Sequence, residues 1–262
     1  MKAMFFNIDG TIISPNTERV SDSVKAAIDE LHANGVTPIL VSGRPPFAIQ
    51  PVAEELSIHT YIAFNGGLAF HDGEIIYNRP IDKAIIEKMV QMSAQLNHSL
   101  VFPGIDGYFT TERNESTWSS IQELFTRVAP LVDPDYWKTH DIYQIELIGK
   151  SEQVHHYVEE FQRDLHFYSW HIHKNATNVN PIENSKAIAM TRVLKHLSID
   201  IADSIAIGDG PNDVEMIETA NIGIAMGNAC ESLKRAANYV TATVWDDGAV
   251  HALRHFNLIA GN

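Results

Sequence analysis

Two polar side chains interrupt the apolar start of the 262-residue chain, at positions 7 and 9. Residues 3–6 are apolar, and Asn7-Ile8-Asp9-Gly10-Thr11 follows them. Only a strand that is covered on both faces is apolar at successive positions, so this run predicts a short buried strand that ends in a loop. Because side chains alternate along extended backbone, we expect Asn7 and Asp9 to share one pocket while Ile8 points into the core.

A later apolar run ends in a crowded acidic loop. Residues 204–207 are followed by Gly208-Asp209-Gly210-Pro211-Asn212-Asp213. Carboxylates this close repel one another unless a cation lies among them, and hard oxygen ligands select Mg²⁺. An acidic turn without a ligand is the alternative. The cation is favoured once Asp9 is counted, because open α/β sheets bind ligands at the carboxyl ends of their strands.

Two other segments could bind an oxyanion. Ser42-Gly43 follows the apolar run 36–41, and a hydroxyl with exposed amides at a strand end suits a phosphate group; a plain turn is the alternative. Lys186 falls in the first turn of an expected helix that Ser185 caps. Its charge opposes the helix dipole there, at a cost of roughly 0.3–1 kcal/mol. A further role would compensate for this cost, and a solvated lysine is the alternative.

Alternating helices and strands are expected to position these segments. The alternation predicts parallel strands with crossover helices, an α/β fold. Apolar periodicity and turn residues predict helices at 21–34, 47–56 and 185–197, strands at 36–41, 61–64, 204–207 and 239–241, a strand and a helix within 222–229, a hairpin at 68–77 and a turn at 246–248.

The pattern changes between about residue 83 and residue 182. Helices and short strands mix there, which is typical of a separate α+β module. We therefore predict a discontinuous core, residues 1–82 plus 183–262, with an inserted module at residues 83–182. Within the module we expect helices at 84–96, 116–128 and 152–165 and strands at 100–102, 108–111, 143–148, 167–173 and 177–179.

Composition limits the classes of partner. The formal charge of −14 disfavours nucleic acid and anionic membrane surfaces, which need clustered Lys and Arg, and leaves a small substrate as the expected partner. No apolar run approaches the about 20 residues of a membrane span, and Asp9 interrupts the apolar start too early for a signal peptide. The single cysteine, Cys230, fits a reducing compartment, so we expect a cytoplasmic protein. His171 and His173 are interpreted as surface residues rather than a metal pair.

Taken together, the motifs resemble the haloacid dehalogenase (HAD) superfamily. Its order and spacing are matched by Asn-Ile-Asp-Gly-Thr at 7–11, Ser-Gly-Arg at 42–44, Lys186 and Gly-Asp-Gly-Pro-Asn-Asp at 208–213, with support from Asn65-Gly66-Gly67 and residues 225–229. The sequence is similar to the Cof-type phosphatases, which carry a large α/β cap inserted after the third core strand. The resemblance implies a Rossmann-like parallel-sheet core and a cap at 83–182 that closes over the substrate and selects it.

This resemblance implies Mg²⁺-dependent hydrolysis of small phosphorylated metabolites, sugar phosphates among them. The family has an aspartate at the position of Asn7, which attacks phosphorus, while Asp9 protonates the leaving oxygen and then activates water. Ser42 and Lys186 would hold the phosphoryl oxygens. The implied metal site consists of residue Asn7, the backbone carbonyl of Asp9, and Asp209, with Asp213 and Asn212 in the same loop, and the implied substrate-lining residues are Gly43, Arg44, Asn65 and Asn212.

Asn7 departs from the family pattern. An amide oxygen is neutral and offers phosphorus no carboxylate, so the chain as written is expected to be nearly inactive. A deliberate substitution or an Asp recorded as Asn is favoured over natural loss of chemistry, because the rest of the motif set remains. A phosphomutase with similar core motifs and a non-catalytic sensor of phosphorylated metabolites are the alternative functions.

Overall fold

The computed structural model describes residues 2–15, 17, 19–113, 128–148, 151–169 and 176–261. The chain forms two compact units. Unit 1 contains Met1–Arg44, Ala48–Asn78 and Ser185–Asn262, and unit 2 contains Pro45–Phe47 and Arg79–Asn184. The chain thus passes between the main parts of the units at 78/79 and 184/185, close to the boundaries expected from the sequence at 82/83 and 182/183.

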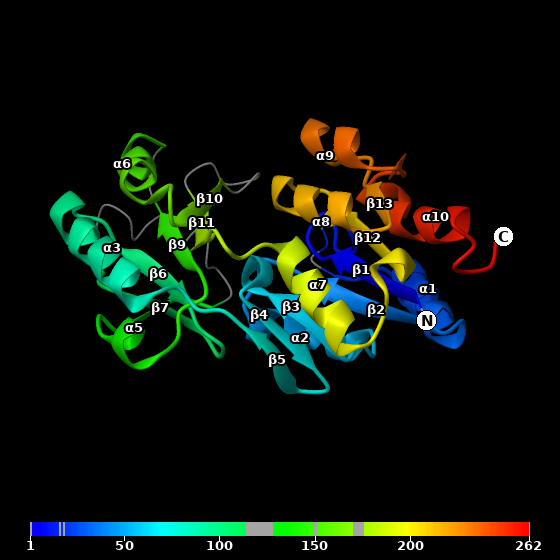
Figure 1. The fold of residues 1–262 in the computed structure, drawn as a ribbon, viewed down its shortest axis with the longest axis horizontal. Coiled ribbons are helices and arrows are strands. Elements are labelled where there is room, and N and C mark those ends of the chain that lie inside the picture. Colours follow the sequence, from blue (N-terminus) through cyan, green and yellow to red (C-terminus); the bar gives the residue numbers. More distant parts are fainter. Residues whose placement is uncertain are drawn as a thin grey trace. The chain divides into compact units, whose positions relative to one another are not determined.

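Unit 1 is built on an eight-stranded sheet with the strand order β14-β13-β12-β1-β2-β3-β4-β5 (Figure 1). The strands from β14 to β3 are parallel, and β4 and β5 add an antiparallel hairpin. This confirms the predicted α/β fold. The strands are β1 (Lys2–Asn7), β2 (Val36–Val41), β3 (Thr60–Ala63), β4 (Leu68–His71), β5 (Glu74–Asn78), β12 (Ser204–Gly208), β13 (Ile222–Ala225) and β14 (Tyr239–Val240).

Helices of unit 1 pack onto this sheet and onto one another. Helix α7 contacts α8, α8 contacts α9, and α1 contacts α10; α7 crosses in front of the sheet in Figure 1. The apolar faces follow the expected periodicity: Val24, Ala27, Ile28 and Leu31 of α1 are all buried. The helices are α1 (Asp22–Ala33), α2 (Pro46–Glu55), α7 (Lys186–His196), α8 (Val214–Thr219), α9 (Glu231–Ala236) and α10 (Gly248–His255); the first two residues of α2 belong to unit 2.

Unit 2 has a six-stranded sheet with the order β10-β11-β9-β6-β7-β8, whose pairs are antiparallel except β7 with β8. Its apolar core includes Ile86, Met89, Leu100, Ile145 and Tyr157. The described elements are α3 (Lys83–Leu96), β6 (Leu100–Pro103), β7 (Tyr108–Thr110), β8 (Leu131–Val132), α5 (Tyr136–Thr139), β9 (Ile145–Ile148), α6 (Ser151–Phe161), β10 (Leu165–Ser169) and β11 (Ala176–Pro181).

Several sequence expectations need correction or lie outside the described residues. The helix expected at 152–165 ends at Phe161, because Leu165 already belongs to β10. The turn expected at 246–248 leads into helix α10, whose buried face includes Val250 and Leu253. The helix expected within 222–229 begins later, because residues 222–225 form β13 and α9 spans Glu231–Ala236. The helix expected at 116–128 falls almost entirely outside the described residues, as does the end of the 167–173 strand with His171 and His173.

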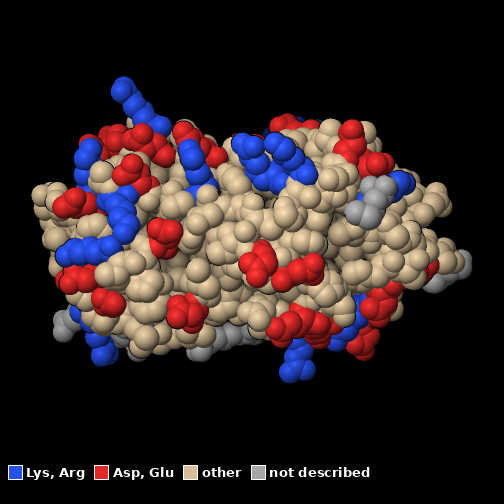
Figure 2. All heavy atoms as spheres, turned by 60° about the horizontal axis from the view of Figure 1, so that its bottom comes forward, with Lys and Arg blue, Asp and Glu red and all other residues tan. Residues whose placement is uncertain are grey.

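The surface carries charges of both signs. On the face shown in Figure 2, Lys and Arg side chains lie among Asp and Glu side chains and do not form one continuous basic surface. No helix in the described part of the chain is long and apolar enough to cross a membrane.

Candidate active site

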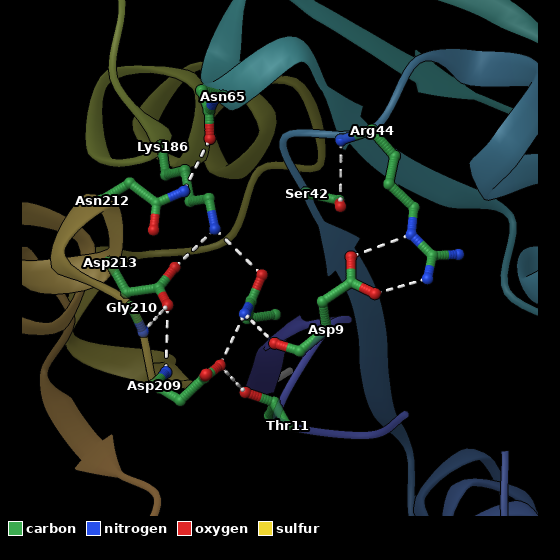
Figure 3. Close-up of polar contacts among 11 residues, drawn as sticks. Asp9, Thr11, Ser42, Arg44, Asn65, Lys186, Asp209, Gly210, Asn212 and Asp213 are labelled. Atoms are coloured by element: carbon green, nitrogen blue, oxygen red, sulfur yellow. Dashed lines mark hydrogen bonds and ion pairs between the residues drawn. The ribbon is translucent and has the colours of Figure 1, made fainter. Parts of the chain in front are cut away.

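The carboxyl ends of the parallel strands bring the predicted residues to one edge of the sheet. In the parallel register, Phe6 of β1 lies beside Leu40 of β2 on one side and Ile207 of β12 on the other. The residues that follow these positions therefore leave the sheet at the same level. Figure 3 shows the resulting cluster, in which side chains that follow β1, β2, β3 and β12 converge with that of Lys186 at the start of α7.

Asn7, the last residue of β1, is the centre of this cluster and is almost fully buried. Its Nδ2 atom donates to the backbone carbonyl of Asp9 at 2.9 Å and to Oδ1 of Asp209 at 2.8 Å. Its Oδ1 atom accepts a hydrogen bond from Nζ of Lys186 at 2.9 Å. Both amide hydrogens and the amide oxygen are thus engaged, which holds the side chain in one orientation.

Lys186 begins α7, and its side chain is only 1% exposed. Nζ donates to Oδ1 of Asp213 at 2.6 Å as well as to Asn7. The helix forms here because Ser185 caps it, accepting a hydrogen bond from the amide of Ile188. The buried carboxylate of Asp213 supplies the compensation that the unfavourable position of Lys186 requires.

Asp213 also shapes the acidic loop after β12. Its Oδ2 atom accepts hydrogen bonds from the amides of Asp209 and Gly210, at 3.0 and 2.9 Å. The side chain is fully buried, and both of its oxygens accept hydrogen bonds within the protein. This arrangement fixes the backbone of the loop, and Oδ1 of Asp209 lies at hydrogen-bond distance from Nδ2 of Asn7.

The carboxylate of Asp209 lies in an unfavourable environment for a charge. Burial, and next the nearby charge of Asp213, raise the pKa of Asp209 to about 7. Hydrogen bonds from Thr11 and Asn7 and the charge of Lys186 oppose this rise in pKa. Thr11 was not singled out by sequence reasoning, although its Oγ1 donates to Oδ1 of Asp209 at 2.8 Å. Its place in the Asp-Gly-Thr segment is the signal that could have identified it.

Asp9 points away from this group and pairs with Arg44. Nε of Arg44 donates to Oδ2 of Asp9 at 2.9 Å, and a second guanidinium nitrogen donates to Oδ1. The side chain of Asp9 is 58% exposed, so the pair is open to solvent. Bidentate pairing of this kind holds the carboxylate in a defined plane.

Loops after β2 and β3 complete the cluster. Ser42 is buried, and its Oγ accepts a hydrogen bond from the amide of Arg44 at 3.1 Å. Asn65 follows β3 with left-handed backbone (φ 55°), and its Oδ1 accepts from Nδ2 of Asn212 at 2.8 Å. A Cβ at Gly43 would lie 3.0 Å from Nδ2 of Asn65, so glycine permits the close approach of these two loops.

One further residue links the first loop to the carboxyl-terminal segments. Nδ2 of Asn228 donates to the carbonyl of Gly10 at 2.9 Å, and its Oδ1 accepts from the amide of Val244 at 2.8 Å. A Cβ at Gly10, whose φ is +76°, would lie 2.1 Å from Oδ2 of Asp209. Gly10 is therefore needed both for its backbone conformation and for the approach of the acidic loop.

The donor set for a divalent cation is incomplete as the residues stand. The carbonyl of Asp9 and Oδ1 of Asp209 converge on one point, but that point is held by an N–H donor of Asn7. The carboxylate of Asp9 faces Arg44, and both oxygens of Asp213 already accept hydrogen bonds. Within the described ranges, no group of three or more His, Cys, Asp and Glu side chains could hold a metal ion. The residues present therefore do not fit the cation.

Comparison of the sequence with known proteins identifies relatives of this chain. A family model of haloacid dehalogenase-like hydrolases matches residues 4–253. The chain is 33% identical over 259 residues, 98% of each sequence, to a putative phosphatase, YkrA, of Bacillus subtilis (strain 168).

Solved structures of HAD-superfamily phosphatases are also similar to this chain. The HAD-superfamily phosphatase BT1666 from Bacteroides thetaiotaomicron superposes with a TM-score of 0.89 and 26% identity, over 99% of this chain and 96% of that one. The sugar phosphatase BT4131, of HAD subclass IIB, superposes with a TM-score of 0.86 and 26% identity, over 99% of this chain and 100% of that one.

Proposed function

Since the chain belongs to the haloacid dehalogenase-like hydrolases and is a Cof-type phosphatase acting on phosphate esters, we propose that its substrates are small phosphorylated metabolites, sugar phosphates in particular. The sugar phosphatase among its structural relatives supports this substrate class. We propose further that the reaction runs through an aspartyl-phosphate at position 7. The expected site of action is the cytoplasm.

The observation that carries the proposal is the environment of position 7. Its side chain lies at the end of a buried strand, within hydrogen-bond distance of both Lys186 Nζ and Asp209 Oδ1. A buried ammonium beside a nucleophile can stabilise the negative charge that develops on a phosphoryl group. Ser42 follows β2 in the same cluster and is buried, and its hydroxyl is the other proposed contact for the phosphoryl oxygens.

The proposed reaction has two steps. In the first, a carboxylate oxygen at position 7 bonds to phosphorus, the bond from phosphorus to the leaving oxygen breaks, and Asp9 gives that oxygen a proton. In the second, a water oxygen bonds to phosphorus, the aspartyl-phosphate bond breaks, and Asp9 takes the water's proton. Each carboxylate oxygen of Asp9 accepts a hydrogen bond from Arg44, so we propose that this pair opens when Asp9 carries the proton, because a protonated carboxyl oxygen donates rather than accepts. The module at 83–182 is proposed to select the substrate.

Asn7 cannot carry out the first step. Its amide nitrogen lone pair is delocalised and its oxygen is neutral, so neither atom is a competent nucleophile for phosphorus. We therefore propose that the chain as sequenced is strongly impaired. Phosphatases of this family generally use a divalent metal, typically Mg²⁺. The form of the protein that would use Mg²⁺ is the one with aspartate at position 7, where the ion would offset negative charge on the phosphoryl group.

Restoring the carboxylate is the direct test of this function. We expect Asn7→Asp to release phosphate from a panel of phosphate esters in the presence of Mg²⁺. The rate should exceed that of the chain as sequenced by on the order of 10³-fold or more, because loss of a nucleophile removes the covalent route. Phosphate release is measured colorimetrically, and ³¹P NMR follows the ester.

Three other outcomes identify different functions. Isomerised sugar phosphate without release of phosphate would assign a phosphomutase. Binding of esters by both forms, with no turnover by either, would assign a sensor of phosphorylated metabolites. Equal turnover by the two forms would contradict the role proposed for position 7.

A further inference from the structure

The amide nitrogen of Asn7 lies between two oxygens that come from distant parts of the chain. It donates to the carbonyl of Asp9 at 2.9 Å and to Oδ1 of Asp209 at 2.8 Å, and the second contact joins positions 202 residues apart. An amide NH₂ group has two hydrogens, so these two bonds use its whole donor capacity. The group therefore connects the β1 loop directly to the acidic loop.

The orientation of this amide follows from its partners. Lys186 can only donate, and the Asp9 carbonyl can only accept. The oxygen of Asn7 must therefore face Nζ of Lys186 and the nitrogen must face Asp9. Rotating the amide by half a turn would place two N–H donors against the Lys186 ammonium, in a site where Lys186 is 1% exposed. This assignment does not depend on the protonation state of Asp209.

A divalent cation would need the same oxygen lone pairs. Mg²⁺ binds hard oxygen ligands at about 2.0–2.1 Å in octahedral geometry. The Asp9 carbonyl and the Asp209 carboxylate are such ligands, but an N–H group offers a cation no lone pair. The amide and the cation thus compete for two oxygens, and the amide has the additional hold of Lys186 on its other end.

We propose that in this chain the Asn7 amide takes the place of a divalent cation and holds the site together without a metal. The amide links the Asp9 carbonyl and the Asp209 carboxylate, and a cation can bind only when that amide is displaced. The proposal draws on the family's metal dependence, but it concerns binding and is tested without turnover. If the proposed phosphatase reaction fails, the Mg²⁺-binding result can therefore still be interpreted.

The test is the response of thermal stability and calorimetric binding to Mg²⁺. We compare the chain as sequenced with Asn7→Asp in EDTA and in millimolar MgCl₂. Without metal, Asn7→Asp brings two carboxylates together and should melt lower than the chain as sequenced. Saturating Mg²⁺ should raise its melting temperature by about 5 °C or more, because a ligand at 100 times its Kd adds several degrees of stability. The chain as sequenced should show no measurable shift.

Asn7→Ser separates competition from charge. This change removes the amide without adding a carboxylate, so both oxygens become available to the ion. Loss of two competing hydrogen bonds should make Mg²⁺ binding measurable by calorimetry, while leaving it weaker than for Asn7→Asp. Its fold can be checked by circular dichroism, and it remains informative if Asn7→Asp does not fold in EDTA.

Asn65→Asp is the matched control. It makes the same Asn-to-Asp change at a buried position of the same cluster, where the side chain contacts Asn212 rather than the two oxygens. It should not create a response to Mg²⁺. Equal responses of the chain as sequenced and Asn7→Asp, whether both large or both absent, would overturn the proposal. A response of Asn65→Asp as large as that of Asn7→Asp would overturn it too.

Discussion

At the scale of single residues, Lys186 is a buried and tightly held charge of unit 1. It combines almost complete burial, a place at the positive end of a helix dipole and two hydrogen-bonded partners, Asn7 and Asp213. A buried ion pair of this kind is weak proof of stability, since desolvation offsets much of its Coulomb energy. Removing one partner is nevertheless costly, because the other charge is left buried and unpaired.

Replacing Lys186 by Met should therefore destabilise the protein strongly. The substitution keeps an apolar stem of similar length and removes the charge, which leaves the Asp213 carboxylate with its two amide donors alone. We expect the free energy of unfolding to fall by about 3 kcal/mol. Urea denaturation followed by circular dichroism measures this loss.

Lys234→Met is the control for this prediction. Lys234 forms a longer contact with Glu231, at 3.6 Å, and is more exposed. Such surface pairs contribute roughly 0–1 kcal/mol, so the change should be small. Similar losses from the two substitutions would show that burial does not govern the effect of Lys186.

At the scale of elements, the site depends on how tightly the turn after β3 approaches α7. Gly66, in the 3₁₀ turn Phe64–Gly66, has φ +108°, and a Cβ there would lie 2.3 Å from the carbonyl oxygen of Ser185. That oxygen belongs to the residue that caps α7 and precedes Lys186. A side chain at Gly66 would thus displace the helix end that carries the buried ammonium.

Gly66→Ala is expected to cost roughly 2–4 kcal/mol of unfolding free energy, from backbone strain together with the clash. Gly73→Ala is the matched control, because Gly73 also has positive φ (+81°) but has nothing within 4 Å of the added Cβ. It should cost about 1 kcal/mol, from strain alone. Chemical denaturation of both variants gives the difference, and equal losses would contradict the close packing at Ser185.

The sheet of unit 2 contains a buried acid on the face opposite its apolar core. Glu146 in β9 is buried, while its neighbours Ile145 and Leu147 belong to the core cluster on the other face. Gln144 donates to Oε1 of Glu146 at 3.5 Å, and Oε2 has no hydrogen-bond partner among the described residues. Burial raises the pKa of Glu146 to about 8, so the folded protein keeps this group protonated at neutral pH.

This shift predicts a pH dependence of stability. The pKa rises from 4.5, the ordinary value of a solvated glutamate, to about 8 on folding, so the folded state binds the proton more tightly than the unfolded state. The contribution of this group to the free energy of unfolding is therefore fully present below pH 4.5 and is lost as pH rises through 8. Glu146→Gln removes this titration, and its stability relative to the parent should increase by a few kcal/mol between about pH 5 and pH 8, since one pKa unit is about 1.4 kcal/mol.

Glu87→Gln, at an exposed position of α3, is the control for that measurement. Because surface substitutions usually change stability by no more than about 0.5 kcal/mol, it should not reproduce the rise expected for Glu146→Gln. Urea unfolding at several pH values gives each difference. If the Glu146→Gln difference is flat across that range, the carboxyl group is ionised in the folded protein and the assigned cause is wrong.

At the scale of the whole molecule, apolar runs and the glycines that follow them were sufficient to predict the α/β sheet. Runs such as residues 36–41 encode burial on both faces, and parallel strands share one edge, so the gathering of Asn7, Ser42 and Asp209 could be expected. Helix α10 was missed because Asp247-Gly248 was interpreted only as a turn. The positive φ angles of Asp247 and Gly66 were not predicted from the sequence and were found only in the structure.

The hydrogen-bond partners of the side chains within the site could not be predicted from sequence patterns. The pairing of Asp9 with Arg44 and the bond from Thr11 to Asp209 depend on rotamers and on contacts between distant segments. The orientation of the Asn7 amide is set by Lys186, which lies 179 residues further along the chain. Sequence patterns report burial and turns, whereas these contacts depend on three-dimensional approach.

The two crossings of the chain between the units lie side by side. Nδ2 of Asn184 donates to the carbonyl of Arg79 at 2.9 Å, and Arg79 also pairs with Glu183. A segment whose ends meet can be removed with a short linker, because loop closure then costs little. Unit 1 also keeps its own eight-stranded sheet, so it has the core that an independent domain requires.

We therefore expect unit 1 to fold when residues 80–183 are replaced by a Gly-Ser linker of about three residues. It should unfold in one cooperative transition, and the melting response of Asn7→Asp to Mg²⁺ should persist, because Asn7, Asp9 and Asp209 all belong to unit 1. Circular dichroism and thermal melts measure both properties, with the full chain carrying the same linker inserted after Asn78 as the control. A shortened chain that binds a hydrophobic dye and melts without cooperativity would show that unit 1 needs unit 2 to fold.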